Sequence, residues 1–175
     1  MNFENLPAVQ DKAEFLANAE MLVDESLAWY AQLADSMELH NNAEAAAQFR
    51  ELERMEKQQL QWIVQQAAGL TLPEIAPWDF AWDIFSEPAS SGFSEIDYLS
   101  SQAGALTAAL HYERHAEKLY RQVAAQTPAA DVRQIANQMA GMQQQEINLL
   151  EKKLSELPEQ AQQSGEDMDP PNMPG

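Results

Sequence analysis

The chain has 175 residues, of which 45% are hydrophobic, and its formal net charge is −18. This length suffices for one domain with a sizeable core, the hydrophobic content is too high for a disordered protein, and so acidic a chain is not expected to bind nucleic acid or anionic membranes. Because the sequence has no cysteine, disulfides, thiolate metal sites and a cysteine nucleophile are excluded.

The N-terminal residues, MNFENLPAVQDKAEF, contain no basic region followed by an apolar run, so they are not read as a secretory signal. No stretch approaches the roughly 20 apolar residues that a membrane span requires. A cytoplasmic location is therefore the expectation.

Four long segments have the composition and periodicity of amphipathic helices. They cover about Asp11–Glu38, Asn42–Gly69, Ser101–Gln126 and Ala129–Leu157. A His-Asn-Asn turn separates the first two, in which Asn42 is suited to cap the second helix and His40 is expected to be a hairpin or capping residue. Thr127-Pro128 separates the last two, and proline suits a first helical turn.

The segment between the second and third helices, LTLPEIAPWDFAWDIFSEPASSGF, differs in composition. Pro73, Pro77 and Pro88 forbid a continuous helix, and the aromatic residues make the segment too apolar for a free linker. We expect residues 70–100 to cross the bundle. Two short-looped helical hairpins joined by a long crossing segment are the ferritin-like form of an all-α four-helix bundle, here residues 1–157. The acidic, proline-rich residues 158–175 are expected to be a disordered tail.

Each predicted helix carries a stripe in steps of three and four that should face the core. Polar residues interrupt three of the four stripes near the middle of the helix. They are Glu56 and Gln59 on the second helix, Glu113 on the third, and Gln143 and Glu146 on the fourth.

Counting residues from the two turns puts these polar residues at one height. Val23 lies 17 residues before His40, and Glu56 lies 16 residues after it. Glu113 lies 14 residues before Thr127, and the two polar residues of the fourth helix lie 16 and 19 after it. At about 1.5 Å per residue, the members of each hairpin are level, which predicts one core layer with three carboxylates and two amides.

Such a layer requires a hard cation, shared protons or trapped water, because no lysine or arginine lies on the same stripes. The alternative is that the stripes are displaced by one position. The glutamates and glutamines would then lie on solvated helix faces, as most such residues do.

Sequence patterns around this layer match a known family. The third helix contains Glu-x2-Ala-x3-Tyr, formed by Glu113, Ala116 and Tyr120, and the second contains Phe-x2-Leu-x3-Glu ending at Glu56. These patterns resemble the rubrerythrin branch of the ferritin-like superfamily over about residues 13–157. In that family the second pattern continues to a histidine, which Gln59 replaces here.

The resemblance implies a site for two iron or manganese ions bound by four glutamates and two histidines. The corresponding positions hold Val23, Glu56, Gln59, Glu113, Gln143 and Glu146. Only Glu56 and Glu113 keep the residue of the family. Imidazole suits redox iron, whereas an all-oxygen set suits Mg²⁺, Ca²⁺ or Mn²⁺, so the iron oxidation of the family is expected to be lost or attenuated.

Several other residues enter the predicted site. Glu20, Asp24 or Glu25 could replace the carboxylate that is missing at Val23. The resemblance also places two tyrosines, Tyr30 and Tyr120, in the core, where they are expected to hydrogen-bond nearby carboxylates.

His111 and His115 have the i, i+4 spacing that can bind a metal on a helix surface. They fall beside the stripe of the third helix, so facing solvent or another helix is the favoured interpretation.

Two hypotheses follow, and they differ on whether the chain is an enzyme. In the favoured one, iron chemistry is lost or attenuated and the protein acts as a binding module or as a partner of an intact relative. In the other, it is an iron or manganese metalloprotein that uses a carboxylate-rich site. The resemblance and the aromatic residues of the crossing segment also suggest a homodimer or a heteromer with a related ferritin-like protein.

Overall fold

The computed structural model describes residues 3, 5–84 and 101–158. The regular structure in these ranges is helical, and the ranges contain no strand. The elements are α1 (Lys12–Leu39), α2 (Ala43–Gln66), the short 3-10 helix η1 (Pro77–Asp79), α4 (Gln102–Gln126) and α5 (Ala130–Glu156). The predicted all-α four-helix architecture is confirmed, and each long helix begins and ends within a few residues of its predicted bounds.

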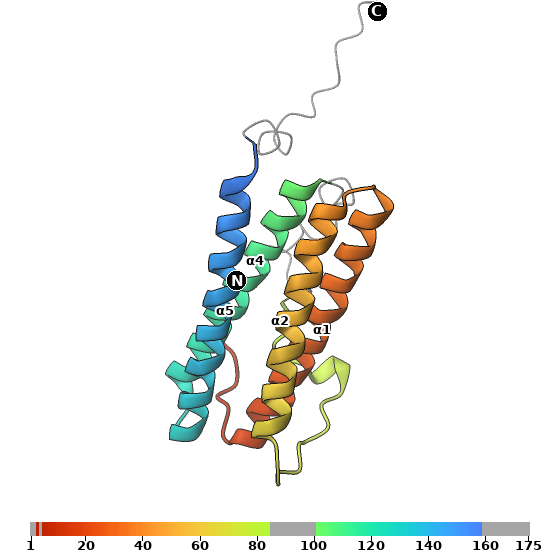
Figure 1. Cartoon of the computed structure of the whole chain (residues 1–175). Helices are drawn as coiled ribbons and strands as arrows, with labels where there is room; N and C mark the ends of the chain where they lie inside the picture. The colour runs from red at the N-terminus through yellow and green to blue at the C-terminus, as the bar shows by residue number, and fades with distance from the viewer. Residues whose placement is uncertain (1–2, 4, 85–100, 159–175) are drawn as a thin grey trace, which may run out of the picture.

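The four long helices form two hairpins that lie side by side (Figure 1). α1 pairs with α2, and α4 pairs with α5, with the helices of each pair antiparallel. Both short turns lie where the sequence predicts them. The crossing segment leaves the end of α2 and carries η1 along the outside of α1 (Figure 1).

Side-chain caps explain where three of the helices begin. Asp11, Asn42 and Ser101 each accept a hydrogen bond from the backbone N–H three residues later, at 2.9, 3.1 and 3.0 Å. These bonds satisfy donors that the first helical turn leaves without an intrahelical partner. The predicted capping role of Asn42 is confirmed. At the other end of this turn, Nδ1 of His40 lies 2.7 Å from the carbonyl oxygen of Ser36, so His40 caps α1 as expected.

The apolar core consists of two clusters along the bundle axis. One contains Phe15, Val23 and Tyr120 and lies toward the start of α1. The other contains Tyr30 and Phe49 and lies toward the turn between α1 and α2. The polar layer predicted from the stripes lies between them, because its residues on α2 and α5 fall between the two sets. On α4, Glu113 lies at the boundary, next to Tyr112 of the first cluster.

The described part of the crossing segment packs against the bundle. Phe80, Trp82 and Ile84 are buried and belong to the first apolar cluster, whereas Trp78 is 85% exposed. The expectation that this segment is packed is therefore confirmed as far as residue 84. The rest of the predicted crossover, residues 85–100, and residues 159–175 of the predicted tail lie outside the described residues.

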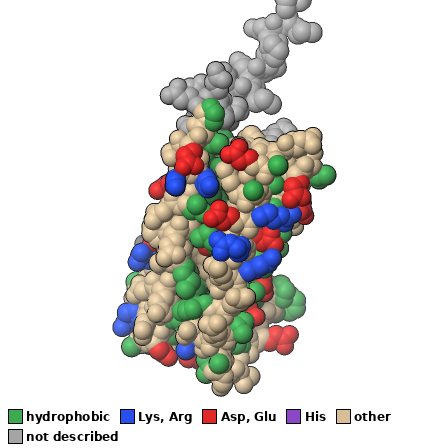
Figure 2. Space-filling model, viewed as in Figure 1, with side chains coloured by type: hydrophobic (Ala, Val, Ile, Leu, Met, Phe, Trp, Pro, Cys, Tyr) green, Lys and Arg blue, Asp and Glu red, His purple; other side chains and the backbone are tan. Residues whose placement is uncertain are grey.

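Basic side chains lie on the surface, interspersed with acidic ones over the outer face of α2 and its neighbours (Figure 2). Arg50 links the first hairpin by ion pairs with Asp35 of α1 at 2.5 Å and with Glu53 of its own helix at 3.0 Å. Exposed pairs of this kind contribute little stability. Among the described helices, none has the length and apolar character needed to cross a bilayer.

Substitution of two glycines by alanine tests the backbone conformation at each position. Gly141 is exposed within α5 with nothing near an added Cβ, so Gly141→Ala should stabilise the protein by about 0.5–1 kcal/mol. Gly69, after α2, has a φ of +78°, so Gly69→Ala should destabilise it by about 1 kcal/mol. Urea unfolding of both variants measures this. Equal effects of the two substitutions would contradict the helical backbone at Gly141 and the positive φ at Gly69.

Candidate metal centre

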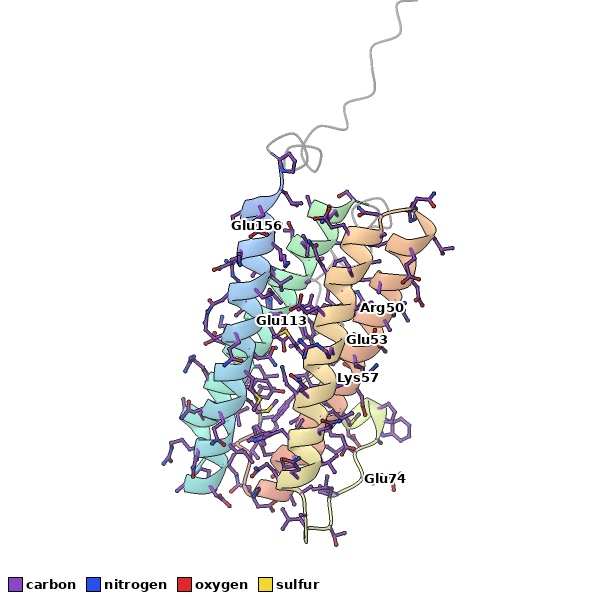
Figure 3. All side chains as sticks on the ribbon, viewed as in Figure 1. Arg50, Glu53, Lys57, Glu74, Glu113 and Glu156 are labelled. Atoms are coloured by element: carbon purple, nitrogen blue, oxygen red, sulfur yellow. The ribbon has the colours of Figure 1, made fainter. Side chains whose placement is uncertain are left out.

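Five polar side chains from three helices meet in the middle of the bundle. α2 provides Glu56 and Gln59, α4 provides Glu113, and α5 provides Gln143 and Glu146. None is more than 4% exposed. Glu113 lies at mid-height inside the bundle, between the two hairpins (Figure 3). The predicted layer is confirmed, and the alternative with displaced stripes and solvated side chains is wrong.

The three carboxylates form a compact group. One oxygen from each of Glu56, Glu113 and Glu146 lies within 4.8 Å of the other two. No lysine or arginine is buried in the part of the chain that the structure describes, so no basic side chain neutralises this group. Ionisation of more than one of them without a cation is therefore opposed by repulsion as well as by burial.

Each carboxyl group is held by one hydrogen-bond donor. The Ser26 hydroxyl donates to Glu56 Oε2 at 2.5 Å. The Tyr30 hydroxyl donates to Oε1 of Glu113, and the side-chain amide of Gln59 donates to Oε1 of Glu146. α1, which provides no carboxylate to the group, thus provides two of its three donors.

Gln143 orients the side chain of Gln59. Gln143 Nε2 donates to Gln59 Oε1 at 2.9 Å. With its oxygen engaged in this way, Gln59 directs its own amide hydrogens toward Glu146. A two-amide relay therefore joins α5 to α2 and back to α5, and it sets the orientation of one carboxylate of the group.

Four buried oxygen atoms of the layer lack any hydrogen-bond partner. They are Glu56 Oε1, Glu113 Oε2, Glu146 Oε2 and Gln143 Oε1. A buried polar atom without a partner costs about 1–3 kcal/mol, and more when it carries charge. Carboxylate and amide oxygens of this kind are the ligand atoms that hard cations prefer.

The electrostatics of the layer favour a neutral or cation-bound state. Burial raises the pKa of Glu56 to about 7. Burial, followed by the negative charge of the other carboxylates, raises the pKa of Glu113 and of Glu146 well above the ordinary range. The pKa of Tyr30 is also raised, first by burial and then by Glu113, so its hydroxyl keeps the hydrogen that it donates.

Of the two tyrosines expected to hydrogen-bond carboxylates, the structure supports one. Tyr30 does so, whereas the buried hydroxyl of Tyr120 has no hydrogen-bond partner among the described residues, so that expectation was wrong. The ring of Tyr120 instead contacts Phe15 and Trp82. Ser26 is a site residue that the sequence patterns do not identify. Its spacing of three residues from Val23, on the buried face of α1, is the available signal.

The carboxylates proposed to replace the one missing at Val23 do not join the group, which among the described residues contains none of Glu20, Asp24 and Glu25. Val23 is buried in the first apolar cluster. Asp24 is exposed, and the half-buried Glu25 has one buried oxygen without a partner. The charge of Asp83 acts on Glu25, so this side chain belongs to the contact between α1 and the crossing segment.

The two neighbouring histidines of α4 face outward, as the sequence analysis favoured. His111 is exposed and His115 is half-buried. Their ring centroids are 4.2 Å apart.

Glu25 provides a pH test of this contact. Burial and Asp83 raise its pKa from 4.5 to about 7, so its ionisation destabilises the fold as the pH rises through this range. Glu25→Gln should therefore gain stability relative to the parent between about pH 5 and pH 8, by on the order of 1 kcal/mol after allowance for solvent exposure. Denaturant titrations at both pH values measure this, with Glu20→Gln on the same helix as control. A difference that does not change with pH would contradict the contact.

No protein-family model matches the sequence, and no curated protein does. The structure is similar to the crystal structure of an uncharacterized conserved protein from Magnetospirillum magnetotacticum MS-1, with a TM-score of 0.71 and 30% sequence identity. The match covers 85% of this chain and 96% of that one.

Proposed function

Since this chain belongs to the same ferritin-like family as the conserved Magnetospirillum protein, we propose that it is a metal-binding member whose iron-oxidation chemistry is lost or attenuated. One observation carries the proposal. Three carboxylates with one oxygen each within 4.8 Å lie buried without a basic partner, and each keeps an oxygen that nothing satisfies. A bound cation would neutralise the group and satisfy these oxygens together.

The donor set favours a hard divalent cation. Every candidate ligand is oxygen, from Glu56, Glu113, Glu146 and the amide of Gln143, and no histidine belongs to the described carboxylate group. Such ligands suit Mn²⁺, Mg²⁺ or Ca²⁺. Mg²⁺ loses its water reluctantly, and Ca²⁺ takes six to eight ligands, so Mn²⁺ fits a small buried group best.

The same residues favour one cation over a pair. Val23 presents an apolar side chain where the resemblance implies a carboxylate, and it is buried. Gln59 stands where the resemblance implies a histidine, and its amide nitrogen donates to Glu146. An apolar group and an N–H donor do not ligate a cation, so a second position has too few ligands.

The surrounding donors would hold the ligands in place. Ser26, Tyr30 and Gln59 each occupy one oxygen of a different carboxyl group and leave the other free. Hydrogen bonds of this kind orient metal ligands and are part of a metal site. A bound cation would supply positive charge and Lewis acidity at the centre of the bundle.

The rubrerythrin-like pattern of α4, from Glu113 to Tyr120, supports a place near that branch of the family. A role beside an intact ferritin-like relative, or as a dimer, remains a prediction from the resemblance. With no cysteine in the sequence, any redox turnover would need an electron donor from outside the chain.

A metal-free core with shared protons is the second candidate. The Ser26 hydroxyl has one hydrogen and two acceptors within reach, Glu56 Oε2 at 2.5 Å and the Val23 carbonyl oxygen at 2.9 Å. When Ser26 donates its hydrogen to the Val23 carbonyl, its contact with Glu56 can be a hydrogen bond only if Glu56 is protonated and donates to the Ser26 oxygen. The raised pKa of Glu56 favours that state.

Manganese titration of the chelator-treated protein separates the two candidates. Under the metal proposal, isothermal titration calorimetry should give one Mn²⁺ per chain. Glu113→Gln and Glu146→Gln should each weaken binding by about 100-fold or more, because each removes a charged ligand. Glu151→Gln, an exposed residue of α5 paired with Arg114, should bind as the parent does. No Mn²⁺, Fe²⁺, Mg²⁺ or Ca²⁺ binding by the folded parent would overturn the proposal in favour of the proton-sharing core.

Thermal unfolding gives an independent measurement of the same site. A ligand at 100 times its dissociation constant stabilises the native state by about 2.7 kcal/mol, so Mn²⁺ should raise the melting temperature of the parent by several degrees. The increase should vanish in Glu113→Gln and persist in Glu151→Gln. An equal increase in both variants would place the binding elsewhere on the protein.

A further inference from the structure

His111 and His115 project from the same face of α4, on successive turns. Residues four apart on a helix are neighbours on its surface, and the two imidazole rings have centroids 4.2 Å apart with planes inclined at 58°. Metal–imidazole bonds of about 2.0–2.1 Å let one ion bridge nitrogens that are roughly 3 Å apart. Rings at this separation can therefore bring one nitrogen each to a shared ion with small side-chain rotations.

A backbone contact determines which nitrogen of His115 is available. Its Nδ1 lies 2.7 Å from the carbonyl oxygen of His111. A carbonyl oxygen can only accept a hydrogen bond, so Nδ1 must carry the hydrogen. In the neutral ring, Nε2 then has a free lone pair. A hydrogen bond from one ring nitrogen to a carbonyl is also the usual way in which proteins orient a metal-binding histidine.

The pair is accessible to solvent, although the positive charge of Arg114 acts on His111. His111 is exposed and His115 is half-buried, so solvent can complete the coordination of an ion. The nearest basic side chain in sequence, Arg114, is paired with Glu151 at 2.7 Å. The net charge of −18 gives the whole protein a negative field that attracts cations.

From this geometry we infer a second, surface metal site on α4, in which His111 and His115 chelate one borderline transition-metal ion such as Cu²⁺, Ni²⁺ or Zn²⁺. Imidazole prefers these ions to the hard cations that an all-oxygen set prefers. The site does not share a ligand with the buried carboxylates and is independent of the function proposed for them. The protein therefore offers two chemically different metal environments, one of oxygen inside and one of nitrogen outside.

The test uses the full chain without an affinity tag and Ni²⁺ as the probe. Calorimetric titration should give one Ni²⁺ per chain, and either His111→Ala or His115→Ala should weaken it by about tenfold or more, because the second ligand of a chelate acts at high effective concentration. His40→Ala removes the one other histidine of the chain and should leave the affinity unchanged.

Two further measurements keep the test decisive. With Cu²⁺, electron paramagnetic resonance should show two coupled nitrogens in the parent and one in His115→Ala. Glu113→Gln should keep Ni²⁺ binding, which separates this site from the buried group. Ni²⁺ affinity that survives either alanine variant, or that is lost in His40→Ala, would overturn the inference.

Discussion

Three carboxylates that share a buried layer without a basic partner are the constraint on which the rest of this structure depends. Glu56, Glu113 and Glu146 each have an oxygen within 4.8 Å of the others, and no described lysine or arginine is buried near them. Desolvation and repulsion together oppose their ionisation. The bundle must therefore supply protons or a cation at this point, and the proposed metal site is the outcome that also satisfies the unpartnered oxygens.

The packing of the bundle can be understood from this layer outward. The two apolar clusters lie on either side of it, and their burial is the main favourable contribution to folding. α1 lacks a carboxylate in the layer, yet Ser26 and Tyr30 bring it into contact with Glu56 of α2 and Glu113 of α4. The polar layer thus links both hairpins, and the four-helix fold forms with Val23 and Gln59 at positions where the resemblance implies a carboxylate and a histidine.

The buried and surface environments would differ in the ions that they select. Oxygen ligands inside favour hard cations, whereas the imidazoles of His111 and His115 favour borderline transition metals. The two proposed sites share α4, because Glu113 faces the core between two histidines that face outward. Helical periodicity is sufficient to separate them, since residues two apart on an α-helix point to different sides.

The sequence by itself determined the four helices, their turns and the height of the polar layer. These features follow from local rules, namely caps such as Asn42, the repeat of 3.6 residues and the rise of about 1.5 Å per residue. Whether the layer lay inside was decided by the packing of the two hairpins. The tertiary structure alone revealed the role of Ser26, the unpartnered hydroxyl of Tyr120 and the position of Glu25 near Asp83. Each of these depends on which side chains of different helices meet, and residues far apart in sequence carry no local signal of that contact.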